Sequence, residues 1–540
     1  MSSKNREAFV SLIAPIGIDI NEVVRVLSDK ARQVAYEPHT IKLTDFLKRL
    51  GRVPSSFSNE VERYATYITA GDKLCEDAQR GDILVLLGVA SLIEKTKEER
   101  IKKVETRRLN IVRQIKRLDE YRTLERIYGR NILHLGCYAP KYSRIAYLVD
   151  RLRVSDRTSS DARLQSQALD IIATDEDEAD HKFGQKVIEV YPRSDFVLDC
   201  TSLKTLERSC ERFFRIYFGD PFVSPTRDEY CSYIANAAAY RSLDLSRQVG
   251  AAIFSDEGEV LSMGCNEVPA PGGGTYWEDH AADSRDYVLG YDSNQRVRED
   301  LARDALARLQ GAGWLLPSMA KLDLETLTAN ALRPEDQAEG KPRGPWRRSM
   351  VSDIIEYGRM VHAEMNAISD AARFNRSTRG ATLYCTTMPC HMCAKLIIAS
   401  GIKRVVYVQP YVKSLAGELF KDSIIFEGTA ADKKVNFDSL KGVTPAGFKR
   451  AFSRSERRKN EDGSALIWEK LEAQPTFLTS IPYYTNLEEG AIAELATVPV
   501  HEIRTAFASA RKKATSPTSK RNSPSTHARA KRRPPKQGAS

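Results

Sequence analysis

The chain has 540 residues, of which 42% are hydrophobic, so it is long enough to bury the cores of two or three domains. Its net charge of +10 lies in residues 511–540, which hold ten Lys or Arg and no Asp or Glu, so the remainder is formally neutral. The sequence has no signal-peptide pattern, no apolar run of membrane-spanning length and no disulfide-like cysteine spacing. These features argue against membrane and secreted classes and predict a cytoplasmic protein.

The first 220 residues alternate short apolar runs with charged, helix-like stretches. This rhythm is typical of an α/β domain in which helices cover a parallel sheet. Residues 94–127 are interpreted as a long amphipathic helix whose charged face is either solvated or binds nucleic acid. The predicted strands are residues 8–15, 82–90, 131–140, 186–190 and 195–199.

A second predicted domain covers residues 225–480. It begins with a helix up to Arg247, followed by two apolar runs at 249–254 and 259–264. The turn residues Asp256-Glu257-Gly258 between these runs indicate a β-hairpin.

The regular pattern stops over about residues 269–350, which we interpret as an insertion or a mobile lid with a charged helix near 297–310. Its "APGGG" sequence either shapes a pocket for an effector or triphosphate or is a plain flexible turn. Residues 481–510 are predicted to form closing helices. The basic tail at 511–540, rich in Ser, Thr and Pro, is predicted to be disordered.

Two short segments contain residues that could bind a metal ion or transfer protons. His362 and Glu364 are separated by one residue, and Cys390 and Cys393 follow Pro389 at the spacing of one helical turn. If each segment begins a helix, one imidazole and two thiolates can share a Zn²⁺ ion, which leaves the fourth position open for water as in catalytic zinc sites. Glu364 would then be free to move protons. A lone C-x-x-C could equally be a redox pair or half of a structural zinc site.

The combination H-x-E…P-C-x-x-C is the signature of zinc-dependent nucleobase deaminases. Through "HAEMNAI", "PCHMC" and the hairpin sequence "RQVGAAIFSDEGEVLSMGCNEVP", residues 225–480 resemble the deoxycytidylate deaminase family. The resemblance implies a three-layer α/β/α cytidine-deaminase-like domain with zinc on His362, Cys390 and Cys393. It also implies Glu364 as the proton shuttle and Asn266 as a contact of the deoxyribose hydroxyl.

The whole chain is similar to the bacterial anti-phage dCTP deaminases, in which a P-loop-kinase-like domain precedes the deaminase domain. The passages that carry this are "LIAPIGIDINEV", "HLGCYAP", "TDEDEADHKFGQKV", and "NEVPAPGGGTYWED" with "YVQPYVKSLAGELFKDSI". This resemblance implies conversion of dCTP to dUTP, antiviral nucleotide depletion and a hexamer.

The first loop departs from a working P-loop. It offers Gly17 as a nucleotide-binding candidate but lacks the lysine and hydroxyl that hold phosphate and Mg²⁺. Residues 1–220 are therefore predicted to be a degenerate P-loop-NTPase-like parallel-sheet domain with a regulatory or scaffold role. Nucleotide binding without turnover and true kinase chemistry are the alternatives.

The predicted substrate is a deoxycytidine nucleotide, dCTP first and dCMP next, with Lys413, Tyr411 and Arg247 as candidate phosphate contacts. The same zinc chemistry also serves deaminases of cytosine or adenine in single-stranded nucleic acid or tRNA. Two features argue against that alternative: residues 1–510 carry no net charge, and aromatic residues are not clustered near the motif. A further possibility, compatible with the first, is a switchable module in which the first domain senses a regulatory nucleotide or RNA and the basic tail engages it.

Overall fold

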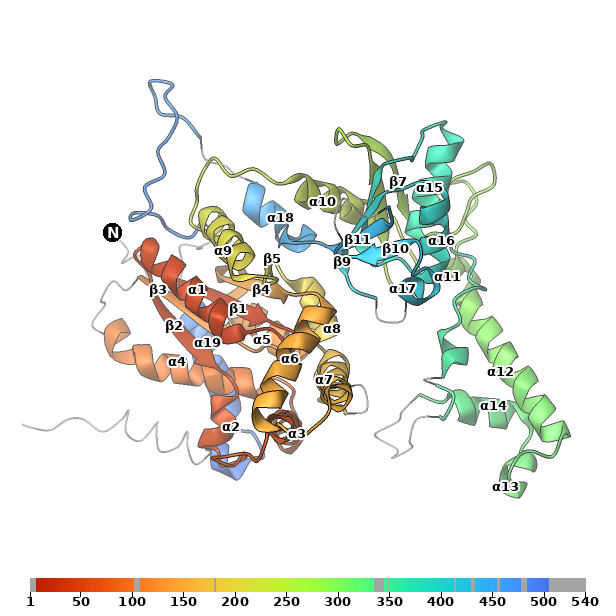
Figure 1. Ribbon diagram of the computed structural model, residues 1–540, viewed down its shortest axis with the longest axis horizontal. Helices are drawn as coiled ribbons and strands as arrows, with labels where there is room; N and C mark the ends of the chain where they lie inside the picture. Colours follow the sequence, from red (N-terminus) through yellow and green to blue (C-terminus); the bar gives the residue numbers. More distant parts are fainter. Residues whose placement is uncertain are drawn as a thin grey trace, which may run out of the picture.

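The computed structural model describes residues 6–101, 107–178, 181–334, 344–347, 349–411, 414–428, 433–453, 457–476 and 483–504. These residues build two six-stranded sheets, each covered by helices on both faces (Figure 1). No helix in this part of the chain is both long enough and apolar enough to cross a bilayer.

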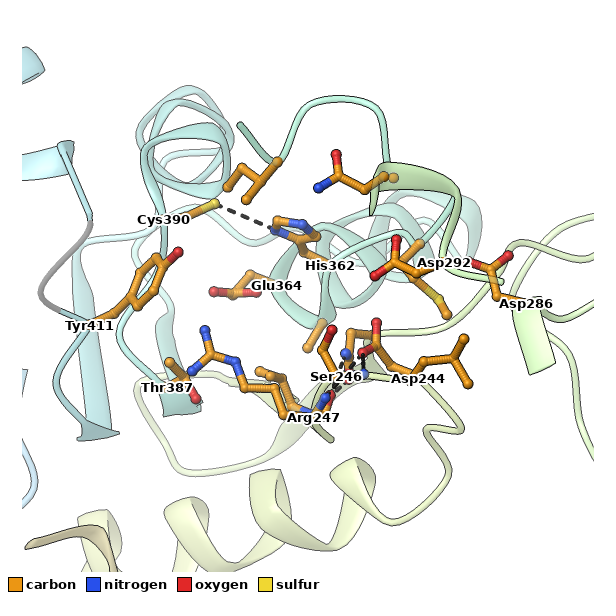
Figure 2. A pocket seen from close by; sticks show the side chains of 18 of the residues that line it. Asp244, Ser246, Arg247, Asp286, Asp292, His362, Glu364, Thr387, Cys390 and Tyr411 are labelled. Carbon is orange, nitrogen blue, oxygen red and sulfur yellow. Dashed lines mark hydrogen bonds between the residues drawn. The ribbon is translucent and has the colours of Figure 1, made fainter. Parts of the chain in front are cut away.

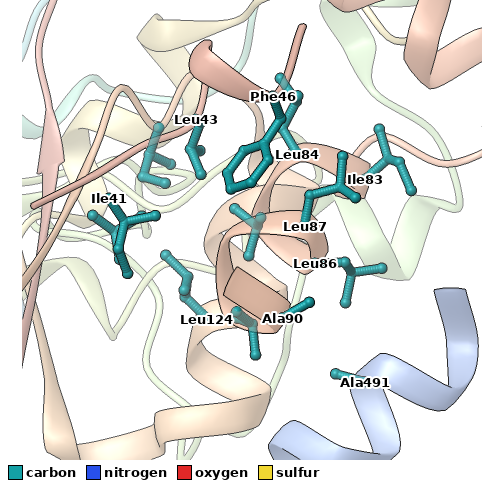
Figure 3. Packing of buried hydrophobic residues seen from close by; sticks show 14 of the residues in the cluster. Ile41, Leu43, Phe46, Ile83, Leu84, Leu86, Leu87, Ala90, Leu124 and Ala491 are labelled. Carbon is teal, nitrogen blue, oxygen red and sulfur yellow. The ribbon is translucent and has the colours of Figure 1, made fainter. Parts of the chain in front are cut away.

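The first sheet has the strand order β12-β5-β4-β1-β3-β2, and all strands except the edge strand β12 are parallel. Side chains of β1 alternate between two cores: Val10 and Leu12 pack in one, Phe9 and Ile13 in the other. Figure 3 shows the second of these cores. The strands are β1 (Arg6–Ile13), β2 (Glu37–Lys42), β3 (Arg107–Arg113), β4 (Ile132–Tyr138), β5 (Phe196–Asp199) and β12 (Gly442–Val443).

Helices close both cores of this sheet. The core of Val10 and Leu12 is covered by α1 (Ile20–Gln33) and α9 (Leu203–Tyr217). The core of Phe9 and Ile13 is covered by α4 (Ile83–Ile101), α5 (Leu118–Tyr128) and α19 (Tyr483–Leu495). The predicted α/β domain is therefore present, and a closing helix from the C-terminal part of the chain completes it.

Three predicted elements of this domain are wrong. Residues 82–90 lie in helix α4, residues 186–190 lie largely in the short helix α8 (Val187–Val190), and the predicted helix over 94–127 contains strand β3. The apolar run of α4 is buried on nearly all sides, so it lacks helical periodicity and looks like a buried strand. Because β3 contains arginines, its sequence looked like part of a charged helix, although the last five residues of the strand are buried.

The second sheet has the order β10-β11-β9-β8-β6-β7, in which only β6 runs antiparallel to the other strands. Ala252 and Phe254 of β6 face α10 (Arg227–Ala239), whereas Ala251 and Ile253 face α15 (Ala363–Arg373) and α16 (His391–Ala399). The predicted hairpin and three-layer arrangement are both present. The strands are β6 (Gly250–Phe254), β7 (Val260–Cys265), β8 (Thr382–Thr387), β9 (Arg404–Gln409), β10 (Ile424–Phe426) and β11 (Val435–Ser439).

The interruption near residues 269–350 is largely helical where the structure describes it. It forms α11 (Asp286–Leu289), α12 (Ser293–Gly311), α13 (Pro317–Ala320) and α14 (Leu324–Leu332), so the charged helix predicted near 297–310 is confirmed. Leu306 of α12 and Leu327 and Ala331 of α14 form a small separate core. α13, α14 and most of α12 extend away from the sheet, whereas α11 and the start of α12 lie beside it (Figure 1).

After β11 the chain returns to the first sheet. β12 pairs with β5, and α18 (Pro445–Phe452) packs beside it and against α10, so part of the 225–480 segment lies on the first sheet. Glu229 of α10 is fully buried and accepts hydrogen bonds from the Arg212 side chain and the Val443 amide. One carboxylate therefore ties α10, which packs on the second sheet, to the first sheet.

Candidate metal centre and catalytic pocket

The zinc-motif residues lie at the N-termini of two helices. His362 is the N-cap of α15, and Cys390 is the N-cap of α16, which confirms the predicted helix starts. An isolated β-bridge between Glu267 and Val361 fixes the chain immediately before His362. The Ser414 hydroxyl donates to the Pro389 carbonyl at 2.8 Å and fixes the chain before Cys390. The positive end of each helix dipole faces the metal-ligand candidates and favours thiolate.

His362, Cys390 and Cys393 form a group that could hold a metal ion. Their ligand atoms all lie within 4.8 Å of one another. The His362 Nδ1 atom lies 3.3 Å from the Cys393 sulfur and 3.4 Å from the Cys390 sulfur. A tetrahedral zinc ion with ordinary bond lengths would separate a nitrogen and a sulfur ligand by about 3.5 Å, so the residues fit zinc. His391 does not join the group, because its Nε2 atom faces Glu356 at 3.4 Å.

The contact between the two thiols shifts their pKa values in opposite directions. A hydrogen bond from Cys393, helped by His362, lowers the pKa of Cys390 to about 4. The same contact with Cys390, together with burial, raises the pKa of Cys393 well above its ordinary value. Burial would lower the pKa of His362, but the hydrogen bond and charge of Cys390 outweigh it and raise that pKa. Zinc binding at neutral pH therefore has to displace the Cys393 proton.

We expect iodoacetamide to label Cys390 in the zinc-free protein already at about pH 6, because Cys390 is a thiolate there. Cys393, a buried thiol, should be labelled far more slowly. Peptide mass spectrometry with and without added zinc measures both rates, and zinc should protect Cys390. Labelling that zinc does not change would show that the two cysteines do not share a metal, and equal labelling without zinc would contradict the opposite shifts of their pKa values.

Glu364 lies in the first turn of α15, beside the three metal-ligand candidates but outside their group. Its side chain points into the same space as His362 and Cys390 (Figure 2). The residue is 4% exposed, and burial raises the pKa of its carboxyl, an effect that the charge of His362 partly opposes. A carboxyl with a raised pKa can hold and release a proton near neutral pH.

Helix α15 is positioned by its contact with β7. Asn366 donates a hydrogen bond to the Cys265 carbonyl at 3.0 Å, and the Ser262 hydroxyl donates to the Ala367 carbonyl at 2.7 Å. At Gly264 the backbones approach so closely that a Cβ atom would lie 2.3 Å from the Ala363 carbonyl oxygen. Nothing in the sequence around Gly264 indicates that this glycine sets the distance between β7 and the helix that carries His362 and Glu364.

Gly264→Ala should therefore push α15 away from β7. Overpacking of this kind costs about 1–3 kcal/mol of the free energy of unfolding, and the shift should also weaken zinc binding, because His362 moves with α15. Chemical denaturation measures the first effect and elemental analysis after dialysis the second. Gly311→Ala is the matched control, because a Cβ atom there meets nothing within 4 Å and both quantities should be preserved. An unchanged Gly264→Ala protein would contradict the assigned contact.

A cavity of about 260 Å³ opens beside the metal-ligand candidates. Figure 2 shows Glu364, Arg247, Tyr411 and Thr387 directed toward it. The insertion contributes to its wall through residues at α11 and the start of α12. The residues that line it include Asp244, Ser246, Arg247, Asn266, Asp286, Asp292, Asn294, Arg298, Met360, Thr387 and Tyr411.

The predicted substrate contacts lie in or beside this cavity as follows. Asn266 lines it, and its amide also holds the loop before β6: Oδ1 accepts from Val249 N at 2.6 Å, and Nδ2 donates to Arg247 O at 2.8 Å. The Arg247 guanidinium lies 5.0 Å from the centre of the Tyr411 ring. Lys413 lies outside the described residues.

The helix predicted to reach Arg247 ends at Ala239 instead. The Asp244 carboxylate accepts hydrogen bonds from the Ser246 and Arg247 amides, which folds residues after α10 into a turn. This turn is what brings Arg247 to the cavity. Asp244 was missed because its signal, a short polar residue after a helix, predicts a turn but no site.

The insertion residues were also missed. Arg298 lines the cavity from α12, and Asp292 caps the same helix by accepting from Gln295 N at 3.0 Å. The sequence allowed the helix to be predicted, but nothing in its spacing relates Arg298 to His362.

Comparison with known proteins gives a consistent result for this region. Residues 225–409 match the family model described as the cytidine and deoxycytidylate deaminase zinc-binding region. The chain is 53% identical over 57 residues to a deoxycytidylate deaminase of Enterobacteria phage T2, which is 11% of this chain and 30% of that protein. It is 46% identical over 66 residues to ComE operon protein 2 of Bacillus subtilis, 12% of this chain and 35% of that protein.

The deoxycytidylate deaminase of Homo sapiens is 37% identical over 76 residues, which is 13% of this chain and 42% of the human protein. The chain thus spans between about a third and two fifths of the length of these relatives. The crystal structure of dCMP deaminase from the cyanophage S-TIM5 in complex with dCMP and dUMP is 17% identical, with a TM-score of 0.22. The aligned region covers 41% of this chain and 100% of the cyanophage protein. A likeness of this size establishes nothing further about this protein. The family match shows that the C-terminal region contains a deoxycytidylate deaminase-like zinc-binding domain.

Proposed function

We propose that this protein is a zinc-dependent enzyme that hydrolyses the exocyclic amino group of cytosine in a deoxycytidine nucleotide and releases ammonia. The observation that carries the proposal is the arrangement of His362, Cys390 and Cys393 around one point, with the buried carboxyl of Glu364 in the same cavity. Three protein ligands with an open fourth position and an adjacent acid–base carboxyl are the arrangement that zinc-dependent nucleobase deaminases use.

Each residue has a defined task in this proposal. When bound by His362, Cys390 and Cys393, zinc would lower the pKa of a water molecule and so supply a nucleophile near pH 7. Glu364 takes up a proton and delivers protons to ring N3 and to the departing amine. Its raised pKa suits this exchange, because it can be protonated and deprotonated within one cycle. Asn266 retains one amide hydrogen and one lone pair that can bind the sugar hydroxyl.

The phosphate groups would lie at the arginine-lined part of the cavity. Arg247 and Arg298 both line it, and in the described part of the chain neither is paired with a carboxylate. Arg298 donates to Ser352 O and to the Gln295 side chain, and its buried Nε atom has no partner. These two arginines, with Tyr411 and Lys413, are the proposed phosphate contacts.

The choice between dCTP and dCMP and the biological role come from resemblance. The likeness to anti-phage dCTP deaminases supports dCTP as the first substrate, with dCMP second. It also supports antiviral depletion of the nucleotide pool and a homohexamer. The first domain would then have a regulatory or scaffold role beside the deaminase.

The test is a comparison of substrates. Zinc-loaded protein is incubated with dCTP, dCMP, CTP and a cytosine-containing single-stranded oligonucleotide, and the products are separated by chromatography. We expect dUTP from dCTP and a smaller or equal rate with dCMP. Conversion of the oligonucleotide alone would replace the proposal with polynucleotide editing, and no conversion of any substrate would reject it.

A further inference from the structure

Residues 352–361, the segment immediately before His362, form one wall of the cavity beside the metal-ligand candidates. Ile355, Gly358 and Met360 of this segment line the cavity. Every residue of the segment is described, and apart from a 3-10 turn at its start and an isolated β-bridge at its end it has no helix or strand. Its shape therefore depends on hydrogen bonds from other parts of the chain.

Helix α12 of the insertion supplies several of these hydrogen bonds. Asn294 and Arg298 lie about one turn apart on α12, so both side chains can reach the same segment. The Asn294 Nδ2 atom donates to the Ile354 carbonyl at 2.9 Å, and its Oδ1 atom accepts from the Tyr357 amide at 3.2 Å. The Arg298 Nη1 atom donates to the Ser352 carbonyl at 2.6 Å. One asparagine side chain therefore joins two points of the segment and closes the backbone between them into a loop.

Asn294 is well placed to hold this wall. Its side chain is half-buried and lines the cavity. It also packs beside Gly358, since a Cβ atom on that glycine would lie 3.8 Å from the Asn294 Cβ atom. Because one end of the amide donates and the other accepts, the two backbone hydrogen bonds fix both the place and the orientation of the side chain.

A second contact from the insertion holds the same segment further along. The Arg359 guanidinium donates to the Asp286 carboxylate at 2.9 Å and to the Ser284 carbonyl at 3.0 Å. Val361, by contrast, is bridged to Glu267, which precedes the insertion. The cavity wall and the start of α15, which carries a metal-ligand candidate and the proposed proton shuttle, are thus held by different parts of the chain.

We propose that Asn294 is a positioning residue for nucleotide binding: through its two backbone hydrogen bonds the insertion holds residues 354–358 as a wall of the substrate cavity. This role rests on the proposed function, because that function assigns the cavity to the substrate. The insertion thereby determines how firmly the nucleotide is bound, whereas the zinc ligands and Glu364 are held without it.

Hydrogen–deuterium exchange of the full-length, zinc-loaded, substrate-free protein tests the contact itself. In Asn294→Ala the peptide that contains Ile354 to Tyr357 should exchange about fivefold faster, because the Tyr357 amide loses its acceptor. The peptide that contains β7 should exchange at the wild-type rate. This measurement needs no substrate, so it also tests the contact in a protein that converts none of the nucleotides.

Steady-state kinetics tests the role in substrate binding, with dCTP or dCMP, whichever nucleotide the wild type converts. Asn294→Ala should raise KM about tenfold and change kcat by less than about threefold, because the wall shifts while the zinc ligands and Glu364 stay in place. Its zinc content and thermal midpoint should equal those of the wild type. Asn330→Ala is the matched control, since Asn330 is exposed on α14 and outside the cavity, and it should change none of these quantities.

The proposal is overturned if Asn294→Ala leaves either KM or the exchange of the 354–357 peptide unchanged. A fall in kcat as large as the rise in KM would place Asn294 in the chemical step and contradict a role in positioning the wall. A loss of zinc or a lower thermal midpoint would show that the residue is structural. A wild type that deaminates no nucleotide would reject the proposed function, and the substrate role with it, but the exchange result would stand.

Discussion

Glu364→Gln is expected to lower kcat for deamination of a deoxycytidine nucleotide by about 10²–10⁴-fold while zinc remains bound. The amide has nearly the shape of the carboxyl, but it cannot accept and return a proton. Glu364 lies outside the group of metal-ligand candidates, so the substitution leaves the ligand set intact. Steady-state kinetics together with the zinc content of the same sample measure both properties.

Glu257→Gln provides the matched control for this substitution. Glu257 lies in the exposed hairpin turn between β6 and β7, so its loss should change neither zinc content nor kcat. If Glu364→Gln retains most of its rate, the proton shuttle is a different group. If it loses zinc, Glu364 supports the metal and its assignment as an independent acid–base group is incorrect.

Cys390→Ser should weaken zinc binding by more than about 100-fold and reduce deamination to background, because a neutral hydroxyl replaces one of two thiolates. The same variant should also show how much of the unfolding midpoint depends on bound zinc. Chelation should lower the unfolding midpoint of the wild type, since bound zinc stabilises the native state, but it should not change the midpoint of Cys390→Ser. Elemental analysis after dialysis and a melting curve with chelator test the two statements.

Cys231→Ala is the appropriate control for the cysteine variant. Cys231 is equally buried but packs on the α10 face of the second sheet, opposite the face that carries α15 and α16. It should keep its zinc and the chelator-dependent midpoint. A Cys390→Ser protein that holds zinc as firmly as Cys231→Ala would remove Cys390 from the ligand set.

The metal-ligand group could be predicted from sequence because its geometry is local. His362 with Glu364 and Cys390 with Cys393 each lie at one helix start, and the family signature rather than their spacing joined the two segments into one site. The hairpin at 250–265 was equally visible, since a strong turn signal separates two apolar runs.

The wall of the cavity could not be predicted, because it is built by contacts between distant segments. Arg298 reaches the site from an insertion helix, and Gly264 matters only through the helix packed on it. Neither has a sequence signal of its own. Strand β3 was hidden for a related reason: its sequence looked like part of a charged helix, and its burial appears only once β3 is placed inside the sheet.

The same limit explains the wrong elements of the first domain. The apolar run of α4 shows no helical periodicity because the first sheet packs against one side of the helix and α19 packs against the other. α19 lies nearly four hundred residues later in the chain, so its presence could not be inferred from the run itself.

The most direct test of the central claim is a zinc titration of activity. Zinc is removed from the pure protein with a chelator and returned stepwise, while bound metal and the deamination rates of dCTP and dCMP are measured on the same samples. We predict that the rate disappears with the metal, rises in proportion to bound zinc and saturates at about one ion per chain. A rate that survives complete removal of the metal, or zinc that binds fully without restoring any deamination, would contradict the account.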